Sequence, residues 1–139
     1  MPANTTPIFT LTPNCKGSTI VAANTARDGS GSLVTAFTAG ANGSLLNKIT
    51  FTNAAASVGA SVLKVVRVFV TDTAGANPYI RSEALLPLIT SSNTVLGATV
   101  TITFTDGLVL ASGQIVKVTQ SLCATSADNS QVFAEGGDY

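Results

Sequence analysis

The residue types that most often carry enzyme chemistry are scarce in this chain of 139 residues. Histidine, the commonest general base and the commonest metal ligand, is absent. Cys15 and Cys123 are the only cysteines, too few for a four-ligand zinc site. No glycine motif for binding phosphates or dinucleotides is present. We therefore expect a protein that is not an enzyme and that needs no cofactor or metal.

Carboxylates are the remaining candidates for chemistry. Glu83 and Glu135 are the only glutamates, and nothing in their spacing brings them to the roughly 5 to 10 Å separation that a glycosidase needs. Turn-like sequence surrounds four aspartates, Asp28, Asp72, Asp106 and Asp128. In such turns the aspartate side chain bonds its own backbone, which is the role we expect here. The alternative is a calcium site, but none of these loops has the oxygen-ligand spacing of a known calcium motif. The sequence predicts no small-molecule substrate.

Charge is low and balanced, with seven basic and seven acidic residues and only 10% charged residues in all. Lys64, Arg67 and Arg81 are the nearest approach to a basic cluster. Since a nucleic-acid interface needs a basic footprint, we expect no nucleic-acid partner. A net charge near zero favours association with other proteins.

The chain shows no sign of export or membrane insertion. No basic region followed by an apolar run opens the sequence, and no run approaches 18 apolar residues. We expect no membrane partner. Cys15 and Cys123 are read as free, largely buried thiols of a protein made in a reducing cytosol, with a disulfide between them as the alternative.

Residues 99–105 alternate between threonine and apolar side chains, which is the clearest pattern in the chain. Because strand side chains point alternately to opposite faces, this pattern predicts a strand with Val100, Ile102 and Phe104 in a core. The opposite face carries the candidate interface residues Thr99, Thr101, Thr103 and Thr105. That face is either solvated sheet or a surface covered by another protein, and the sparse charge favours the second.

Shorter copies of this pattern recur between turn signals and predict an all-β protein. The expected strands cover residues 8–12, 18–23, 33–38, 45–53, 62–71, 79–90, 99–105, 115–122 and 132–135. About eight short strands at this spacing indicate a single antiparallel β-sandwich, of jelly-roll or Greek-key type.

Three local signals refine this expectation. Asn42-Gly43 lies between two apolar runs and predicts a hairpin that joins residues 33–38 to 45–53. Residues 62–71 are apolar on both faces, which is typical of a central strand or of a face covered by a neighbouring subunit. Pro87 confines residues 79–90 to an edge or a break.

The sequence also suggests three segments: an extended arm at 1–7, a β-sandwich domain at 8–135 and a tail at 136–139. Two glycines in the tail are typical of fraying. Tyr139 is instead a candidate interface residue, because tyrosine is enriched where proteins meet. Both interpretations stay open.

Two stretches resemble small structural proteins of tailed bacteriophages. One combines the run Ala-Asn-Thr-Ala-Arg-Asp-Gly-Ser-Gly at 23–31 with Val-Thr-Ala-Phe-Thr-Ala-Gly-Ala-Asn-Gly-Ser at 34–44. The other is the ending Val-Phe-Ala-Glu-Gly-Gly-Asp-Tyr at 132–139. The resemblance implies a virion structural protein made in the host cytoplasm, and by analogy a decoration or cement protein on the capsid surface.

That role implies contact partners rather than substrates: the major capsid protein and copies of the chain itself, as a homotrimer closed by heterologous contacts. A protein of the tail, collar or fibre is the first alternative. A surface carbohydrate-binding module is the second, and the absence of tryptophan disfavours it.

Overall fold

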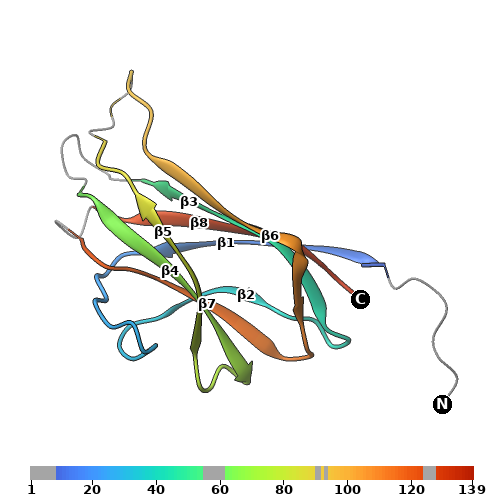
Figure 1. The fold of residues 1–139 in the computed structure, drawn as a ribbon. Helices are drawn as coiled ribbons and strands as arrows, with labels where there is room; N and C mark the ends of the chain where they lie inside the picture. The colour runs from blue at the N-terminus through green and yellow to red at the C-terminus, as the bar shows by residue number, and fades with distance from the viewer. Residues whose placement is uncertain (1–8, 55–61, 90–91, 93, 124–127) are drawn as a thin grey trace, which may run out of the picture.

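The computed structural model describes residues 9–54, 62–89, 92, 94–123 and 128–139, and they form a sandwich of two four-stranded antiparallel sheets (Figure 1). The expected extended arm at 1–7 lies outside these residues. The strands are β1 (Thr12–Ile20), β2 (Val34–Thr38), β3 (Ser44–Asn53), β4 (Lys64–Thr73), β5 (Tyr79–Leu86), β6 (Thr99–Leu110), β7 (Gln114–Gln120) and β8 (Ser130–Asp138). The predicted all-β sandwich is confirmed.

The order of strands is that of a jelly roll. One sheet runs β1-β8-β3-β6 and the other β2-β7-β4-β5. The first strand therefore pairs with the last, the second with the seventh, the third with the sixth and the fourth with the fifth. A long antiparallel ribbon rolled up on itself produces this nesting of pairs, with β4 and β5 as its closed end.

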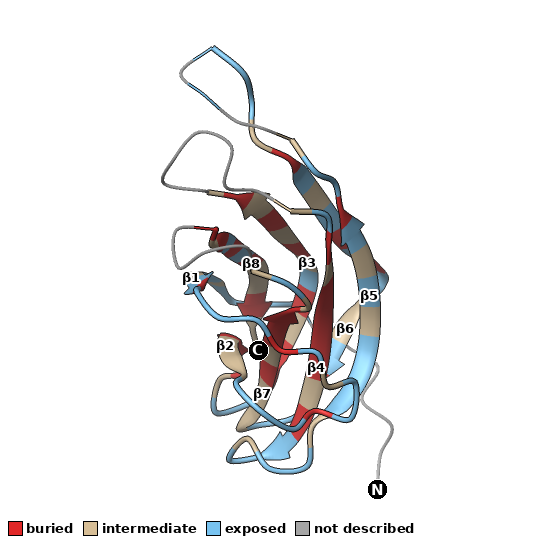
Figure 2. Cartoon of the chain, turned by 90° about the vertical axis from the view of Figure 1, so that its left-hand side faces the viewer, coloured by how far each residue is buried: buried red, intermediate tan, exposed pale blue. Residues whose placement is uncertain are grey.

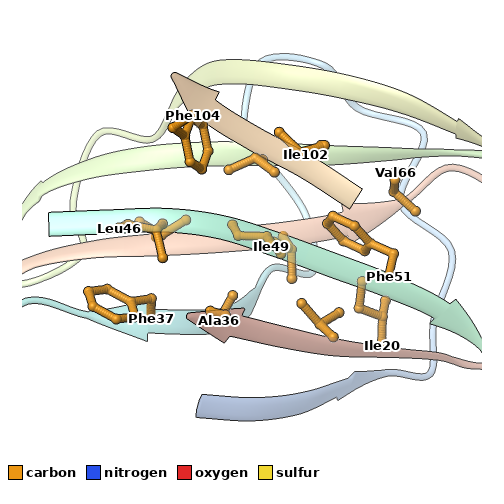
Figure 3. Packing of buried hydrophobic residues seen from close by; sticks show 14 of the residues in the cluster. Ile20, Ala36, Phe37, Leu46, Ile49, Phe51, Val66, Ile102 and Phe104 are labelled. Atoms are coloured by element: carbon orange, nitrogen blue, oxygen red, sulfur yellow. The ribbon is translucent and has the colours of Figure 1, made fainter. Parts of the chain in front are cut away.

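The core lies between the sheets, where both contribute apolar side chains (Figure 3). Ile102 and Phe104 from β6 belong to it, and Val100 packs against it, as the alternating pattern predicts. The other labelled members are Ile20, Ala36, Phe37, Leu46, Ile49, Phe51 and Val66. Figure 2 shows the resulting alternation of buried and exposed residues along the strands.

The first strand differs from the expectation. We predicted a strand over residues 8–12 that Pro13 ends and a second over 18–23, whereas β1 runs unbroken from Thr12 to Ile20. This strand lies at the edge of its sheet and pairs only with β8. An edge strand tolerates proline because the missing N–H is not needed on its free side.

The predicted hairpin at residues 40–43 is also wrong. The chain does turn there, with the Gly43 N–H bonded to the Gly40 carbonyl at 3.1 Å. Gly43 has a φ of 90°, but Asn42 is not among the described residues with positive φ, so the type I′ turn that favours hairpins does not form. The turn instead carries the chain from β2 in one sheet to β3 in the other.

The predictions of a central strand at residues 62–71 and of an edge strand interrupted at Pro87 are both correct. The strand β4 lies inside its sheet between β7 and β5, and β5 lies at the edge and ends at Leu86, immediately before Pro87.

Asp106 and Gly107, which we expected to follow the threonine strand as a turn, form a bulge within β6. Their φ angles are 62° and 79°, and the register with β3 shifts between Thr103 and Leu108.

Candidate protein interface

The outer face of the β1-β8-β3-β6 sheet carries the predicted threonine row as part of a larger array. Thr99, Thr101, Thr103 and Thr105 are all exposed. Thr99 lies opposite Thr52 on β3, and Thr101 lies opposite Thr50. The paired hydroxyls are 3.3 and 3.2 Å apart, so each pair forms a cross-strand hydrogen bond.

Strand register extends these pairs into three ranks that cross all four strands. The first rank is Thr19, Gln131, Thr52 and Thr99. The second is Gly17, Phe133, Thr50 and Thr101, and the third is Cys15, Glu135, Lys48 and Thr103. We call these residues together with Thr105 the threonine face. Only its third rank is charged, and there Lys48 and Glu135 form an ion pair of 3.1 Å.

Phe133 stands near the middle of the threonine face and is 48% exposed. A Cβ at the neighbouring Gly17 would lie 3.8 Å from the phenylalanine ring, so the absent side chain leaves the ring open to one side. A shallow depression of about 390 Å³ results, and Thr19, Thr50 and Gln131 are among its lining residues. An apolar ring bordered by neutral hydrogen-bonding groups suits contact with another uncharged surface.

Tyr139, the fifth candidate interface residue, lies apart from the threonine ranks. Its N–H bonds to the Gly43 carbonyl at 3.2 Å, and its carbonyl accepts from the Asn42 amide at 3.3 Å. With Asn42, Val109, Leu110 and Ala111 it borders a second depression of about 420 Å³. Sequence reasoning did not link the residue to the turn at 40–43, because the two are almost a hundred positions apart.

The residues just before Tyr139 continue β8 through Gly136 and Gly137 to Asp138, beyond the boundary expected at 135. The Asp138 carboxylate accepts hydrogen bonds from the Asn14 amide at 2.8 Å and from the Ser44 hydroxyl. These bonds hold the pKa of Asp138 below its ordinary value, because they stabilise the charged form. Asp138 thereby ties β1 and the start of β3 to the last strand.

The chain itself covers part of the outer face of the other sheet, while Ile80 and Leu85 of β5 stay exposed there. Residues 21–33, which we call the strap, cross β7, β4 and β5 (Figure 2). The Asn24 N–H bonds to the Gln120 carbonyl at 2.8 Å, and its carbonyl accepts from Arg67 at 3.1 Å. The run at 23–31 lies wholly within this strap.

One glutamate and two arginines hold the strap down. Glu83 on β5 accepts from Arg67 Nε at 2.8 Å and from Arg27 of the strap at 2.7 Å. Arg67 is only 6% exposed, and Phe69 on the same face is fully buried although it lies outside the core cluster between the sheets. The apolar outer face of β4, which sequence reasoning assigned to a central strand or a subunit contact, is therefore an internal contact.

The strap also has bonds of its own. The Asn24 amide donates to the carbonyls of Ser30 and Ser32 at 2.8 Å each. The Asp28 carboxylate accepts from the Ser30 hydroxyl and N–H, and these two bonds lower the pKa of Asp28. Asp28 therefore stabilises a turn, as the sequence predicts.

The remaining ionisable residues do not converge on a reaction centre. Glu83 and Glu135 lie on different sheets. Among the described residues no group of three or more acidic residues, cysteines or histidines is placed to hold a metal ion. Cys15 is a free thiol and is exposed rather than buried as expected, and the Cys123 thiol donates to the Asp128 carbonyl at 3.3 Å. No described helix is long and apolar enough to cross a membrane.

Lys64 and Asp128 form the most deeply buried ion pair, with 2.6 Å between Nζ and Oδ1 and both side chains fully buried. Gln120 donates to the Asp128 carbonyl at 3.2 Å and accepts from the Ser130 hydroxyl at 2.7 Å. This network joins β4 of one sheet to the start of β8 in the other. Lys64 and Arg67 do not form a basic cluster, because their side chains lie on opposite faces of β4.

No family model, no curated protein and no solved structure matches this chain.

Proposed function

We propose that the protein is a structural protein of a tailed-phage virion that decorates the capsid and contacts the major capsid protein through the threonine face. The observation that carries the proposal is the contrast between the two sheets: the strap covers the middle of one outer face, around Arg67, while no described segment lies over the other. That open face is broad, regular and neutral apart from one ion pair. A partner can cover it without burying unpaired charge, which is the most costly part of forming an interface.

The mechanism is mechanical rather than chemical. Copies seated over junctions between capsid subunits add buried contact area, and that area opposes separation of the subunits under internal DNA pressure. The phage-like runs support the virion setting. Under this proposal the protein is made in the host cytoplasm and then binds to the capsid surface.

Binding to particles tests this role. Purified protein is added to virions that lack it, and bound copies are counted by sedimentation and located by electron microscopy. We expect wild-type protein on the heads and at least a tenfold loss of binding for Thr50→Asp, which places a charge in the centre of the threonine face. Thr73→Asp, at an exposed position of the other sheet, is the matched control and should bind normally. Binding to tails alone, or equal binding by both variants, contradicts the proposal.

The half-exposed ring of Phe133 favours one second candidate, a carbohydrate-binding module. Neutral hydroxyl and amide groups beside an aromatic ring can hold a sugar. A glycan array with wild-type protein and Phe133→Ala distinguishes the two functions. Binding that the variant loses would support the module, and no binding by wild-type protein would remove it.

A further inference from the structure

Four strands form the edges of the sandwich, and three of them carry features that discourage pairing with another strand. The strand β1 contains Pro13, Lys16 and Gly17. The strand β2 has only five residues and a register shift. The strand β5 carries Arg81 and Glu83, and its register with β4 also shifts. Proline, charge, short length and bulges are the devices by which natural sheets protect their edges.

The fourth edge, β6, has none of these devices from Thr99 to Thr103, and its bulge at Asp106 and Gly107 lies beyond the threonine row. Residues 99–105 contain no charged residue, no proline and no glycine, and their pairing with β3 stays regular from Thr99 to Thr103. In the part of the chain that the structure describes, β6 pairs with β3 alone. Among the described residues, no backbone hydrogen bond outside the strand ladders involves residues 99–105. Its free side therefore presents backbone donors and acceptors in a strand ready to pair.

The pattern of this edge is also symmetric. Read in either direction from Ile102, the stretch alternates apolar and threonine side chains and ends in threonine. Antiparallel pairing with an identical strand about Ile102 would place Thr101 opposite Thr103 of the second copy and Thr99 opposite Thr105. Every threonine would then lie on the same outer face, and every apolar side chain on the inner face. The Thr50–Thr101 and Thr52–Thr99 hydrogen bonds already show this kind of pair within one chain.

We infer that two copies of the chain pair through β6, antiparallel and centred on Ile102, and that the two β1-β8-β3-β6 sheets become one continuous eight-stranded sheet. The contact is isologous, since the same strand serves on both sides of a twofold axis. It joins two threonine faces into one surface twice as wide. This pairing does not depend on the virion role, and it gives a twofold pair where the phage resemblance implies a trimer.

The contact is small, because seven paired residues bury less than the roughly 1,600 Å² of a standard stable interface. We therefore expect a pair that dissociates on dilution and that forms fully where copies are crowded.

Light scattering over a dilution series tests the pairing. Wild-type protein should change from the mass of two chains to that of one as it is diluted. Thr101→Lys, which places two like charges across the twofold axis, should remain a single chain throughout. Thr50→Lys makes the same change on the same face but inside the sheet, and should behave as wild type. A single chain at every concentration, a trimer, or equal behaviour of the two variants overturns the inference.

Cysteine cross-linking tests the register independently, in a Cys15→Ser/Cys123→Ser background. The pair Thr101→Cys with Thr103→Cys faces itself across the axis and should give a covalent dimer on mild oxidation. The pair Thr99→Cys with Thr101→Cys has the same spacing on the same face but would face Thr105 and Thr103 of the second copy, and should give none. Equal cross-linking of both pairs, or none for the first, contradicts pairing about Ile102.

Discussion

On the β2-β7-β4-β5 sheet, the outward-facing residues of the central strand include Arg67 and Phe69. Both are buried within the chain, and Arg67 donates a hydrogen bond to the strap. On the β1-β8-β3-β6 sheet, the corresponding central positions carry Thr50 and Phe133, and no described segment lies over them. Both faces belong to four-stranded antiparallel sheets in one sandwich. They differ in their cover: the strap lies over part of the first face, and no described segment lies over the second.

The energetic consequence is that similar substitutions should act differently on the two faces. A side chain under the strap contributes to the folding free energy, since its partners are part of the same chain. A side chain on the threonine face has few partners within the chain and should contribute little to the folding free energy. Stability and binding should therefore separate by face, and the following substitutions test this separation.

Arg67→Ala should have the largest effect. It removes a nearly buried guanidinium that bonds both Glu83 and the Asn24 carbonyl. The Asn24 carbonyl then loses this donor, and Glu83 keeps only its bond from Arg27. We expect a loss of about 3 kcal/mol in the free energy of unfolding, measured by urea denaturation. Amide hydrogens of residues 21–33 should also exchange faster.

Arg81→Ala is the matched control for this prediction. Arg81 lies on β5 of the same sheet, is exposed, and contacts the Phe104 ring with 5.8 Å from guanidinium carbon to ring centre. Removing it should cost less than about 1 kcal/mol. Equal losses for the two arginines would mean that the strap is not held by Arg67.

Asp138→Asn should have an intermediate effect, because it weakens the bonds that tie the last strand to Asn14 and Ser44. We expect a loss of about 1 kcal/mol near neutral pH. The lowered pKa of Asp138 adds a pH dependence with a defined sign. The stabilisation is present above the ordinary aspartate value of 3.8 and is lost as pH falls through the lower folded value.

Unfolding free energies measured from pH 7 to pH 2 for both proteins separate this contribution from others. Asp28 also has a lowered pKa and is unchanged in the variant, so its share of the acid dependence remains in both curves. The gap between wild type and variant should close toward low pH. A gap that is constant over the whole range would show that the Asp138 charge does not stabilise the fold.

Most of the strands were predictable from sequence because their signals are local. The alternation at 99–105 identified which side chains of β6 enter the core, and Pro87 marked the end of an edge strand. The turn at 40–43 was predictable as a turn for the same reason. Its role was not, since turn chemistry reverses the chain without determining which sheet the next strand joins.

The strap and the threonine face depend on contacts between distant residues. Apolar residues on both sides of 62–71 showed that something covers β4, but the cover is a glycine-containing segment more than thirty positions earlier, with no apolar pattern of its own. The threonine ranks likewise require β3 to pair with both β6 and β8 in one register. Such pairings set the site, and no single stretch of sequence contains them.

Arg27→Ala should have a smaller effect than Asp138→Asn. The Arg27 side chain is 68% exposed, so its ion pair with Glu83 is screened by water and salt. We expect a loss below about 1 kcal/mol that shrinks further in high salt, measured by urea denaturation at two salt concentrations. The internal bonds of Asn24 and Asp28 should keep the strap in place. A loss of stability as large as that of Arg67→Ala would mean that Arg27, and not Arg67 alone, holds the strap against the sheet.

Thr50→Ala should have the smallest effect on the free protein, although it lies at the centre of its sheet. Within the described part of the chain its hydroxyl bonds the Thr101 hydroxyl alone, on a face open to water that can replace this bond. We expect a change within about 0.5 kcal/mol in the free energy of unfolding, together with weaker binding to the particles that bind the wild-type protein. A loss of stability comparable to that of Arg67→Ala would mean that the threonine face, like the strap-covered face, serves the fold. Unchanged stability with unchanged binding would mean that partners use another surface. Only the combination of an intact fold and weakened binding fits a face completed by a second molecule.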